Sequence, residues 1–545
     1  MFTKHYNQLS PYFTLLFYIF AVFNIAMTGL YYVPEFDFLP EFALFNNIVI
    51  GFIYFLLKSK ASKPYVFYSY LGLLIISFFV YIILSCCELF LTFGASFNAF
   101  FLMDQATIQI KILIAVFYLF FLFIFRLEFR LVRFYNLELL FIFALLAWTS
   151  ILSSFTFNFV FLFLTMELLT ILLVILMAIY FIFVGTKLLK PVTQFFILNV
   201  VISVFFLLGF CLLLYSLVYF NTFNASYLIL VNTYINYTIL GVSATTLLIF
   251  FKFISALFLL PFIFKLTFAP FSIWIINIYT HLPLVLLMLL MTVYKIIYSF
   301  IYIRLFLGIL DVLALDPFIN FSNILFICFI IPSLFVGCLA FKQLDFKTFL
   351  AYTTVSQLGY IFTGILTTNV LAVAQSLAYL LVYCLHLLLI FSIFVVVKKK
   401  YSITNINQLF IIKFYDQYLF YTLLFIIFSL AGIPPLGGFA IKIYLFLQVY
   451  AAGHQILAVV SLFSSFVMSI IYLKISIKLF LSKNTFYSTL QHITYKKEFL
   501  FQHTISSGFI LGIYSFAFII FNYFIYADLL TFILVDLVKQ LVFYI

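Results

Sequence analysis

Four ionisable side chains lie inside long apolar runs of the sequence, at depths where a charge is costly. They are Glu167, Lys265, Lys295 and Lys442. A charged group at the centre of a bilayer costs about 2.5–3.5 kcal/mol on insertion scales, so such residues indicate a function. Burial favours the neutral form of a lysine, and a neighbouring carboxylate favours the charged form. We therefore expect Glu167 to hold the proton of Lys265, and a row of such groups to pass protons along.

Each of these residues also has a structural alternative. A lysine near the end of a span can extend its ammonium group to the lipid headgroups, and this explanation applies to Lys265 and Lys442. Lys442 lies six residues from the end of its apolar run, which is roughly 9 Å along a helix. Lys295 is more than halfway along its run, where this extension is harder. The alternative for Glu167 is a neutral carboxyl group bound to the backbone.

Two further polar side chains inside apolar runs are secondary candidates. His386, in LVYCLHLLLIF, could relay a proton, and a hydrogen-bonded structural histidine is an equal alternative. Gln357, in TTVSQLGYIF, does not titrate but could hold a water molecule. Lys111 and Lys252 are explained by ammonium groups that reach the headgroups, and we do not include them in the site.

Prolines interrupt two of the lysine-bearing runs. They are Pro261 and Pro270 in the first run and Pro434 and Pro435 in the second. Proline breaks a helix, and the backbone groups that it frees inside a membrane recruit water. The two broken helices are five spans apart, so the second crosses the membrane in the opposite direction, as in transporters built from inverted repeats. We expect each break to open a hydrated gap that its lysine uses.

The composition indicates an all-α polytopic membrane protein. Of the 545 residues, 68% are hydrophobic and 8% are charged, against about a quarter charged in soluble domains. The runs are apolar on every face, which excludes the alternating strands of a barrel. We count about fifteen transmembrane helices, near residues 12–33, 40–57, 65–87, 107–125, 136–155, 157–184, 191–219, 239–268, 282–303, 321–341, 348–367, 372–397, 417–448, 452–481 and 508–531.

Charges alternate from one connection to the next. Basic residues gather in even-numbered connections, at Lys58, Lys60, Lys63, Arg126, Arg130, Arg133, Lys187, Lys190, Lys342, Lys347, Lys398, Lys399, Lys400, Lys413, Lys483, Lys496 and Lys497. Odd-numbered connections carry acids or no charge, the acids being Glu35, Asp37, Glu41, Asp104, Asp311 and Asp316. Basic connections stay on the side of synthesis, so we expect the N-terminus there and the C-terminus opposite. The net charge of +12 then reflects topology and lipid contact and implies no nucleic-acid partner.

Composition also bears on cofactors and location. The six cysteines form no CxxC pair and lie in or near the ends of apolar runs, so we expect no metal, iron–sulfur cluster or other cofactor in this chain. Phe (83) and Tyr (39) are abundant, whereas Gly (17) and Pro (12) are scarce. Codons rich in A and T would produce this bias, and we therefore expect a gene in an AT-rich genome such as that of an organelle.

The residues around these lysines resemble the antiporter-like subunits of respiratory complex I, and within that family most closely its chain 2 branch. The first broken helix of the family is matched by Phe264, Lys265, Leu266, Pro270, Phe271, Trp274, Tyr279 and Pro283. The next lysine of the family corresponds to Lys295. Three further segments match family motifs: LTMELLTI, KTFLAYTTVSQLGY and SLAGIPPLGGFAIK. The combination is specific, and the resemblance covers about residues 136–480.

The resemblance implies a fold, an activity and partners. The segments would be residues 1–135, with one helix more than the family core, inverted five-helix repeats at 136–307 and 308–482, and a connection with the last helix at 483–545. Protons would be translocated through Glu167, Lys265, Lys295 and Lys442, driven by NADH:ubiquinone oxidoreduction in other subunits that hold FMN, iron–sulfur clusters and ubiquinone. The partners would be other membrane subunits of the complex and lipids, in the mitochondrial inner membrane or a bacterial plasma membrane.

Departures from the family pattern leave alternatives open. Ser272 replaces the motif histidine, Ile276 and Asn277 replace Pro-Asp, and Gln194 stands where a lysine is common. Residues 221–237 look like an insertion. The alternatives are a self-contained cation/proton antiporter, a chain-4-like sister subunit of the same complex, and a structural scaffold whose lysines only reach the headgroups.

Overall fold

The structure is a computed structural model of the chain. It describes residues 39–57, 63–88, 94–96, 101–132, 136–156, 158–184, 189–219, 244–268, 272–306, 335–367, 369–401, 405–481 and 523–543. The chain divides into two compact units, Met1–Gly185 and Thr186–Ile545, and each unit is described by itself. The predicted span near 12–33, Pro270, the suggested insertion at 221–237 and most of the span near 321–341 lie outside the described residues.

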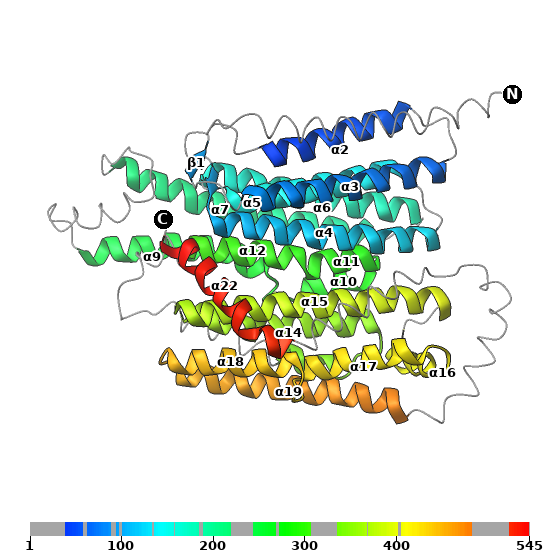
Figure 1. The fold of residues 1–545 in the computed structure, drawn as a ribbon. Helices are drawn as coiled ribbons and strands as arrows, with labels where there is room; N and C mark the ends of the chain where they lie inside the picture. The colour runs from blue at the N-terminus through cyan, green and yellow to red at the C-terminus, as the bar shows by residue number, and fades with distance from the viewer. Residues whose placement is uncertain are drawn as a thin grey trace. The chain divides into compact units, whose positions relative to one another are not determined.

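Helices account for nearly all of the described residues (Figure 1). The first unit holds α2 (Leu39–Leu57), α3 (Lys63–Glu88), α4 (Gln105–Val132), α5 (Leu137–Phe155), α6 (Phe159–Val184) and an antiparallel pair of short strands, β1 (Gly94–Ser96) and β2 (Phe101–Met103). The second unit holds α7 (Leu189–Tyr219), α9 (Ala244–Lys265), α10 (Ile273–His281), α11 (Leu284–Met291), α12 (Val293–Ile303), α14 (Phe346–Leu366), α15 (Val370–Tyr401), η3 (Ile406–Ile411), α16 (Ile412–Tyr415), α17 (Gln417–Ala431), α18 (Gly437–Ala451), α19 (Gln455–Leu481) and α22 (Tyr523–Phe543).

The helical membrane architecture predicted from composition is confirmed. In the part of the chain that the structure describes, nine helical segments are long and apolar enough to cross a membrane. The total of fifteen spans stays a prediction, and so do the boundaries of the two inverted repeats. The predicted last span near 508–531 lies mostly outside the described residues, and α22 extends from Tyr523 to Phe543. α22 packs on α15 and α18 (Figure 1).

The interior of the second unit is formed by the segment of α11 and α12, together with α14 and α15. The apolar segment Leu284–Phe306 is 100% buried, and Phe346–Leu366 and Val370–Lys398 are 94% and 89% buried. The segment Pro191–Leu212 of α7 is only 33% buried, as expected for a helix that faces lipid. Polar groups on the three most buried segments are therefore surrounded by protein and not by lipid. A polar group buried in this way needs a hydrogen-bond partner.

Two predicted even-numbered connections and the end of the predicted fourteenth span meet in the second unit. Asp345, which precedes α14, forms an isolated bridge with Asn405, which precedes η3. The Nζ atom of Lys413 on α16 lies 3.5 Å from the carbonyl oxygen of Phe480, near the end of α19. These contacts place the connections after the predicted tenth and twelfth spans, and the end of the predicted fourteenth span, at one end of the unit. This arrangement agrees with the charge alternation, which stays a prediction.

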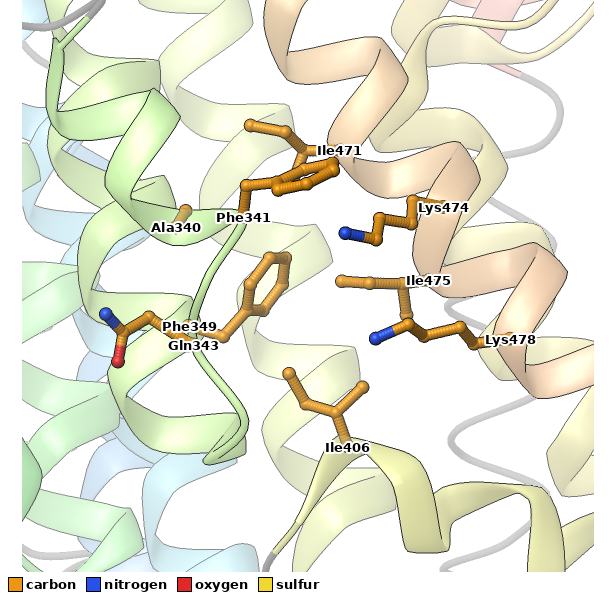
Figure 2. Close-up of a pocket in the computed structure, with 9 residues that line it drawn as sticks. All are labelled: Ala340, Phe341, Gln343, Phe349, Ile406, Ile471, Lys474, Ile475 and Lys478. Carbon is orange, nitrogen blue, oxygen red and sulfur yellow. The ribbon is translucent and has the colours of Figure 1, made fainter. Parts of the chain in front are cut away.

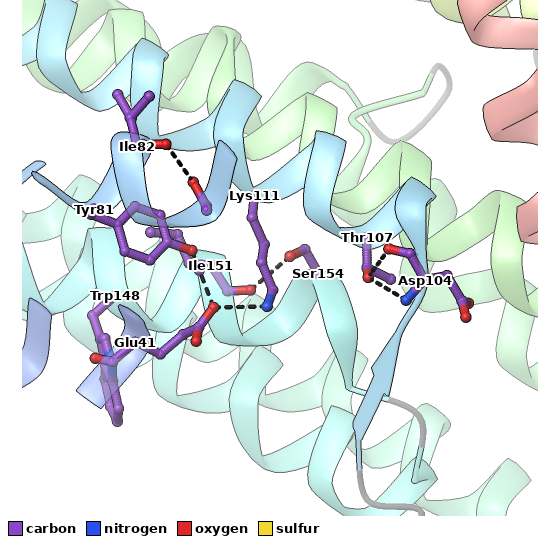
Figure 3. Close-up of polar contacts among 10 residues, drawn as sticks. Glu41, Tyr81, Ile82, Asp104, Thr107, Lys111, Trp148, Ile151 and Ser154 are labelled. Carbon is purple, nitrogen blue, oxygen red and sulfur yellow. Dashed lines mark hydrogen bonds and ion pairs between the residues drawn. The ribbon is translucent and has the colours of Figure 1, made fainter. Parts of the chain in front are cut away.

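A buried ion pair joins two helices of the first unit. The Lys111 ammonium on α4 lies 2.7 Å from Oε1 of Glu41 on α2, and the two side chains are 0% and 2% exposed (Figure 3). The Tyr81 hydroxyl donates to the same oxygen at 3.2 Å, and the Lys111 ammonium lies 4.0 Å from the centre of the Phe155 ring. The expectations that Lys111 reaches the headgroups and that Glu41 belongs to a connection are therefore wrong. Sequence reasoning missed the pair because its members are separated by about two predicted spans.

We expect Lys111→Met to destabilise the first unit, because the variant leaves the Glu41 carboxylate buried without its cation. Loss of one member of a buried ion pair costs about 3–5 kcal/mol. The double variant Glu41→Gln/Lys111→Met removes both charges and should recover most of this loss. Thermal unfolding of the purified protein in detergent measures both variants. A Lys111→Met protein as stable as the wild type would show that the pair is not formed.

Candidate functional site

The first lysine cluster consists of Lys265, the last residue of α9, and Lys295 on α12. Both side chains are buried, at 5% and 2% exposure. The Lys295 ammonium donates to the carbonyl oxygen of Lys265 at 3.1 Å and to Oγ1 of Thr267 at 2.8 Å. The Lys265 ammonium lies 5.2 Å from the centre of the Tyr298 ring, within the range of a cation–π contact. The predicted neighbours are thus brought together around one helix end.

The end of α9 explains why Lys295 has partners in this cluster. The helix continues through Pro261 and ends at Lys265, so the predicted break lies after Pro261 and before the start of α10. The last carbonyls of a helix have no partner within it, and the Lys295 ammonium binds one of them. Thr267 has φ +65°, a conformation that β-branched residues rarely adopt. Its hydroxyl completes the cradle of oxygens around the Lys295 ammonium.

The ninth predicted span is also broken, and the sequence analysis missed this break. α11 ends at Met291 and α12 begins at Val293, with Thr292 between them at φ −115° and ψ −84°. The Thr292 hydroxyl donates to the Met288 carbonyl at 2.8 Å. Neither proline nor glycine marks this position, so the break has no composition signal. It lies one turn before Lys295 and places polar backbone next to the first lysine cluster.

The second lysine cluster is built around Lys442 on α18. Its side chain is 6% exposed, and its ammonium donates to the carbonyl oxygens of Leu430 at 2.6 Å and Ala431 at 3.3 Å. These carbonyls belong to the last turn of α17. Gly432, the residue that follows the helix, has φ +83°. A cation is favoured at the C-terminal end of a helix by the unpaired carbonyls and the helix dipole. The predicted single span over residues 417–448 is thus two helices, broken as the prolines indicated.

His386 of α15 belongs to the same break. Its Nδ1 lies 2.7 Å from the Val382 carbonyl oxygen and its Nε2 lies 2.7 Å from Oγ of Ser429, the residue before Leu430. A carbonyl only accepts, so Nδ1 carries the hydrogen and, in the neutral ring, Nε2 accepts from the Ser429 hydroxyl. The Gly438 N–H donates to the same hydroxyl oxygen at 3.2 Å. His386 is therefore connected to the Lys442 cluster through Ser429, as a relay or a structural histidine would be.

Gln357 of α14 lies in a cluster of buried tyrosines. Its side chain is 0% exposed, and its Oε1 accepts a hydrogen bond from the Tyr379 hydroxyl at 2.6 Å. The Tyr360 ring stacks on the Tyr379 ring with centroids 5.6 Å apart. The role of Gln357 in holding water stays a prediction.

One helix, α15, reaches both lysine clusters. The Cys384 sulfur lies 4.0 Å from the Thr292 carbonyl oxygen at the break before Lys295, and His386, two residues further on, reaches Ser429 at the break before Lys442. Sequence reasoning missed Thr292, Thr267 and Ser429, because small hydroxyl side chains are common in membrane helices. Their nearness to a proline, a glycine or a buried lysine was the available signal.

Burial decides between the two explanations given for the lysines. Lys265, Lys295 and Lys442 are at most 6% exposed and their ammonium groups contact protein. The alternative that these lysines reach the lipid headgroups is therefore wrong. Glu167 lies on α6 in the first unit and is half-buried, with its carbonyl oxygen accepting from Thr170. Its pairing with Lys265, which belongs to the second unit, stays a prediction.

Buried lysines at the ends of broken helices define a polytopic membrane protein with the features of an ion pathway. The family model described as NADH:quinone oxidoreductase/Mrp antiporter, transmembrane, matches residues 156–469. The chain belongs to this family. The match includes Glu167, the three buried lysines, His386 and Gln357.

Several curated proteins are similar to this chain. NADH-quinone oxidoreductase subunit N of Pelagibacter ubique is 31% identical over 217 residues, which are 39% of this chain and 44% of that protein. The subunit N of Francisella tularensis subsp. holarctica is 28% identical over 293 residues, 53% of this chain and 57% of that protein. The chain thus spans about half the length of the curated relatives it matches.

Solved structures show the same fold. A chain of respiratory complex I from Thermus thermophilus superposes with a TM-score of 0.64 at 17% identity, over 90% of this chain and 98% of that chain. A chain of the Mrp complex from Dietzia sp. superposes with a TM-score of 0.67 at 14% identity, over 92% of this chain and 97% of that one. At these identities the likeness concerns the fold alone.

We expect Gly438→Ala to disturb the second lysine cluster. A Cβ at this position would overlap the Ser429 carbonyl, so α18 would have to move away from α17 and from the oxygens that bind the Lys442 ammonium. Gly72→Ala on α3 is the matched control, because a Cβ there meets nothing within 4 Å and alanine favours a helix by about 0.8–1.0 kcal/mol over glycine. Thermal unfolding should show a lower midpoint for Gly438→Ala and no loss for Gly72→Ala. Equal midpoints for wild type and Gly438→Ala would contradict the close approach of α17 and α18.

Proposed function

We propose that this chain is an antiporter-like membrane-arm subunit of an NADH:quinone oxidoreductase and translocates protons through its buried lysines. The observation that carries the proposal is the contact of the Lys295 and Lys442 ammonium groups with main-chain carbonyls at two helix breaks. Family membership and the similarity to NADH-quinone oxidoreductase subunits N support the same assignment.

The carbonyl contacts suit a group that must release its proton. A carbonyl oxygen stabilises an ammonium group but carries no formal charge, so it does not hold the proton as firmly as a carboxylate would. Lys295 binds the main-chain carbonyl of Lys265, which places both lysines at one helix end, and like charges near each other would each raise the cost of the other's proton. A change of charge at one lysine can thereby be passed to the next.

The transfer would continue along α15 to the second cluster. Cys384 and His386 connect the break at Thr292 with the hydroxyl of Ser429 and so with the carbonyl that binds Lys442. Glu167 would start the series of proton transfers. Its carboxylate would keep Lys265 protonated, and Lys265 would release its proton when the carboxylate no longer acts on it. Each proton moved against the membrane potential costs about 2.3 kcal/mol per 100 mV, so an outside source of energy is required.

We infer that other subunits supply this energy. Quinone reduction by NADH would take place in partner chains that hold FMN, iron–sulfur clusters and ubiquinone, and this chain would carry no redox group. Its partners would be neighbouring membrane subunits and lipids. We assign it to the mitochondrial inner membrane on the amino-acid bias that AT-rich codons would produce, with a bacterial plasma membrane as the alternative that the mostly bacterial relatives favour.

A self-contained cation/proton antiporter is the second candidate. The family description includes Mrp antiporters, and the fold of the Dietzia Mrp chain matches with a TM-score of 0.67. Mass spectrometry of the intact assembly extracted in mild detergent separates the two candidates. A subunit of NADH:quinone oxidoreductase will be recovered with flavin- and iron–sulfur-containing partners. Recovery of the chain without them would favour the antiporter.

We expect Lys295→Met and Lys442→Met to abolish most proton transfer by the assembly in proteoliposomes. A positioned acid–base group contributes about 100-fold or more to a proton-transfer rate, and methionine keeps the side-chain length without the titrating group. Lys342→Met is the control, because Lys342 is exposed in the connection before α14. A pH-sensitive dye inside the vesicles measures protons moved per quinone reduced. Wild-type ratios in both cluster variants would refute the proposal.

A second set of variants tests the predicted pair of Glu167 and Lys265. Glu167→Gln should lower proton transfer, because the carboxylate no longer favours the protonated lysine. If the two groups act together, the double variant Glu167→Gln/Lys265→Met should be no slower than Lys265→Met alone. Glu138→Gln in the first turn of α5 controls for loss of a carboxylate in the same unit. Fully additive losses in the double variant would show that the two residues act separately.

A further inference from the structure

A small pocket opens between α19 and the segment that precedes α14. It encloses about 300 Å³, including the space open to its surroundings, and is lined by Ala340, Phe341, Gln343, Phe349, Ile406, Ile471, Lys474, Ile475 and Lys478 (Figure 2). Its walls are apolar except for Gln343 and the two lysines. Figure 2 shows the ends of both lysine side chains directed from α19 into this space. None of these residues belongs to the proposed proton pathway.

The two lysines give the pocket a local excess of positive charge. They are four residues apart on one helix, so they lie one turn apart on the same face and repel each other. In the part of the chain that the structure describes, neither has a carboxylate within ion-pair distance. The Lys474 ammonium lies 3.0 Å from the centre of the Phe341 ring. An anion bound between the lysines would relieve their repulsion.

We expect the pocket to lie at the depth of lipid headgroups on the basic side. Its walls come from the connection before α14, from the start of η3 and from the last turns of α19, which lie together at one end of the unit. Lys474 is seven residues from the end of α19, which is about 10 Å along a helix. Phe341 is 45% exposed and Leu344 is 56% exposed, so apolar side chains border the charged space where acyl chains would begin.

We propose that this pocket binds the phosphate headgroup of an anionic phospholipid, with Lys474 and Lys478 contacting the phosphate and Phe341 contacting the first acyl carbons. Basic pockets between membrane helices on this side recognise anionic headgroups. Inorganic phosphate shares the anionic chemistry but has no acyl chains to cover Phe341. The lipid is therefore the occupant that satisfies both the charge and the apolar border.

Native mass spectrometry of the purified assembly, titrated with phosphatidylglycerol or with phosphatidylcholine in detergent, tests the site. The wild type should bind phosphatidylglycerol in preference to phosphatidylcholine. In Lys474→Met/Lys478→Met the affinity should fall by about 25-fold, because each lysine near an anionic headgroup contributes roughly a factor of five. Lys398→Met/Lys539→Met is the matched control and should bind as the wild type does, because it removes two exposed charges outside the pocket.

Two further measurements keep the result interpretable. Lys474→Arg/Lys478→Arg retains the charge and should retain binding, which separates loss of the site from loss of the fold. Inorganic phosphate at millimolar concentration should displace little phosphatidylglycerol; full displacement would identify an anion site without lipid selectivity and overturn the proposal. Equal binding of phosphatidylglycerol by the wild type and the methionine variant would also overturn it.

Discussion

The second unit depends on one interaction, the hydrogen bond from a buried lysine ammonium group to a main-chain carbonyl at the end of a helix. Burial of a charge in a low dielectric is costly unless the charge is bound by polar groups. Each helix end supplies carbonyls that have no partner within the helix. Lys295 binds such a carbonyl at the end of α9, and Lys442 binds two at the end of α17. The helix breaks therefore supply the hydrogen-bond acceptors of the buried lysines directly.

A comparison of two kinds of buried lysine shows why this choice of partner matters. Lys111 is paired with the carboxylate of Glu41, and this ion pair joins α2 to α4. The ammonium groups of Lys295 and Lys442 donate to carbonyl and hydroxyl oxygens. Neutral partners leave the protonation state responsive to other charges nearby. The same residue type thus serves as a fixed connector in the first unit and as a candidate carrier in the second.

The sequence predicted those features of the site that involve unusual residue types within an apolar run. Prolines, glycines and isolated charges stand out in an apolar run. The two proline-associated breaks and the buried lysines could therefore be predicted from the sequence alone. The break at Thr292 could not be found, because threonine is compatible with an uninterrupted helix. The Glu41–Lys111 pair was missed for a different reason: each residue alone has an ordinary explanation, and only the packing of α2 on its neighbours brings them together.

Hydrogen-bond partners were the second kind of information that the sequence lacked. The SLAGIPPLGGFAIK segment predicted a break beside a lysine, but the ammonium was expected to meet water there. The structure shows that it contacts the Leu430 carbonyl oxygen at 2.6 Å, and the hydrated gap stays a prediction. Gly438 is required for this geometry because its missing side chain lets α18 approach the Ser429 carbonyl. Such a contact depends on the angle between two helix segments, which local sequence does not specify.

A cryo-electron microscopy map of the assembly in lipid, at a resolution that defines lysine side chains and bound water, tests this account most directly. The account predicts density for the Lys442 ammonium against the carbonyls of Leu430 and Ala431, and for the Lys295 ammonium between Thr267 and the Lys265 carbonyl. Side chains that extend instead into the lipid headgroups, or that lie apart from the helix ends, would contradict it.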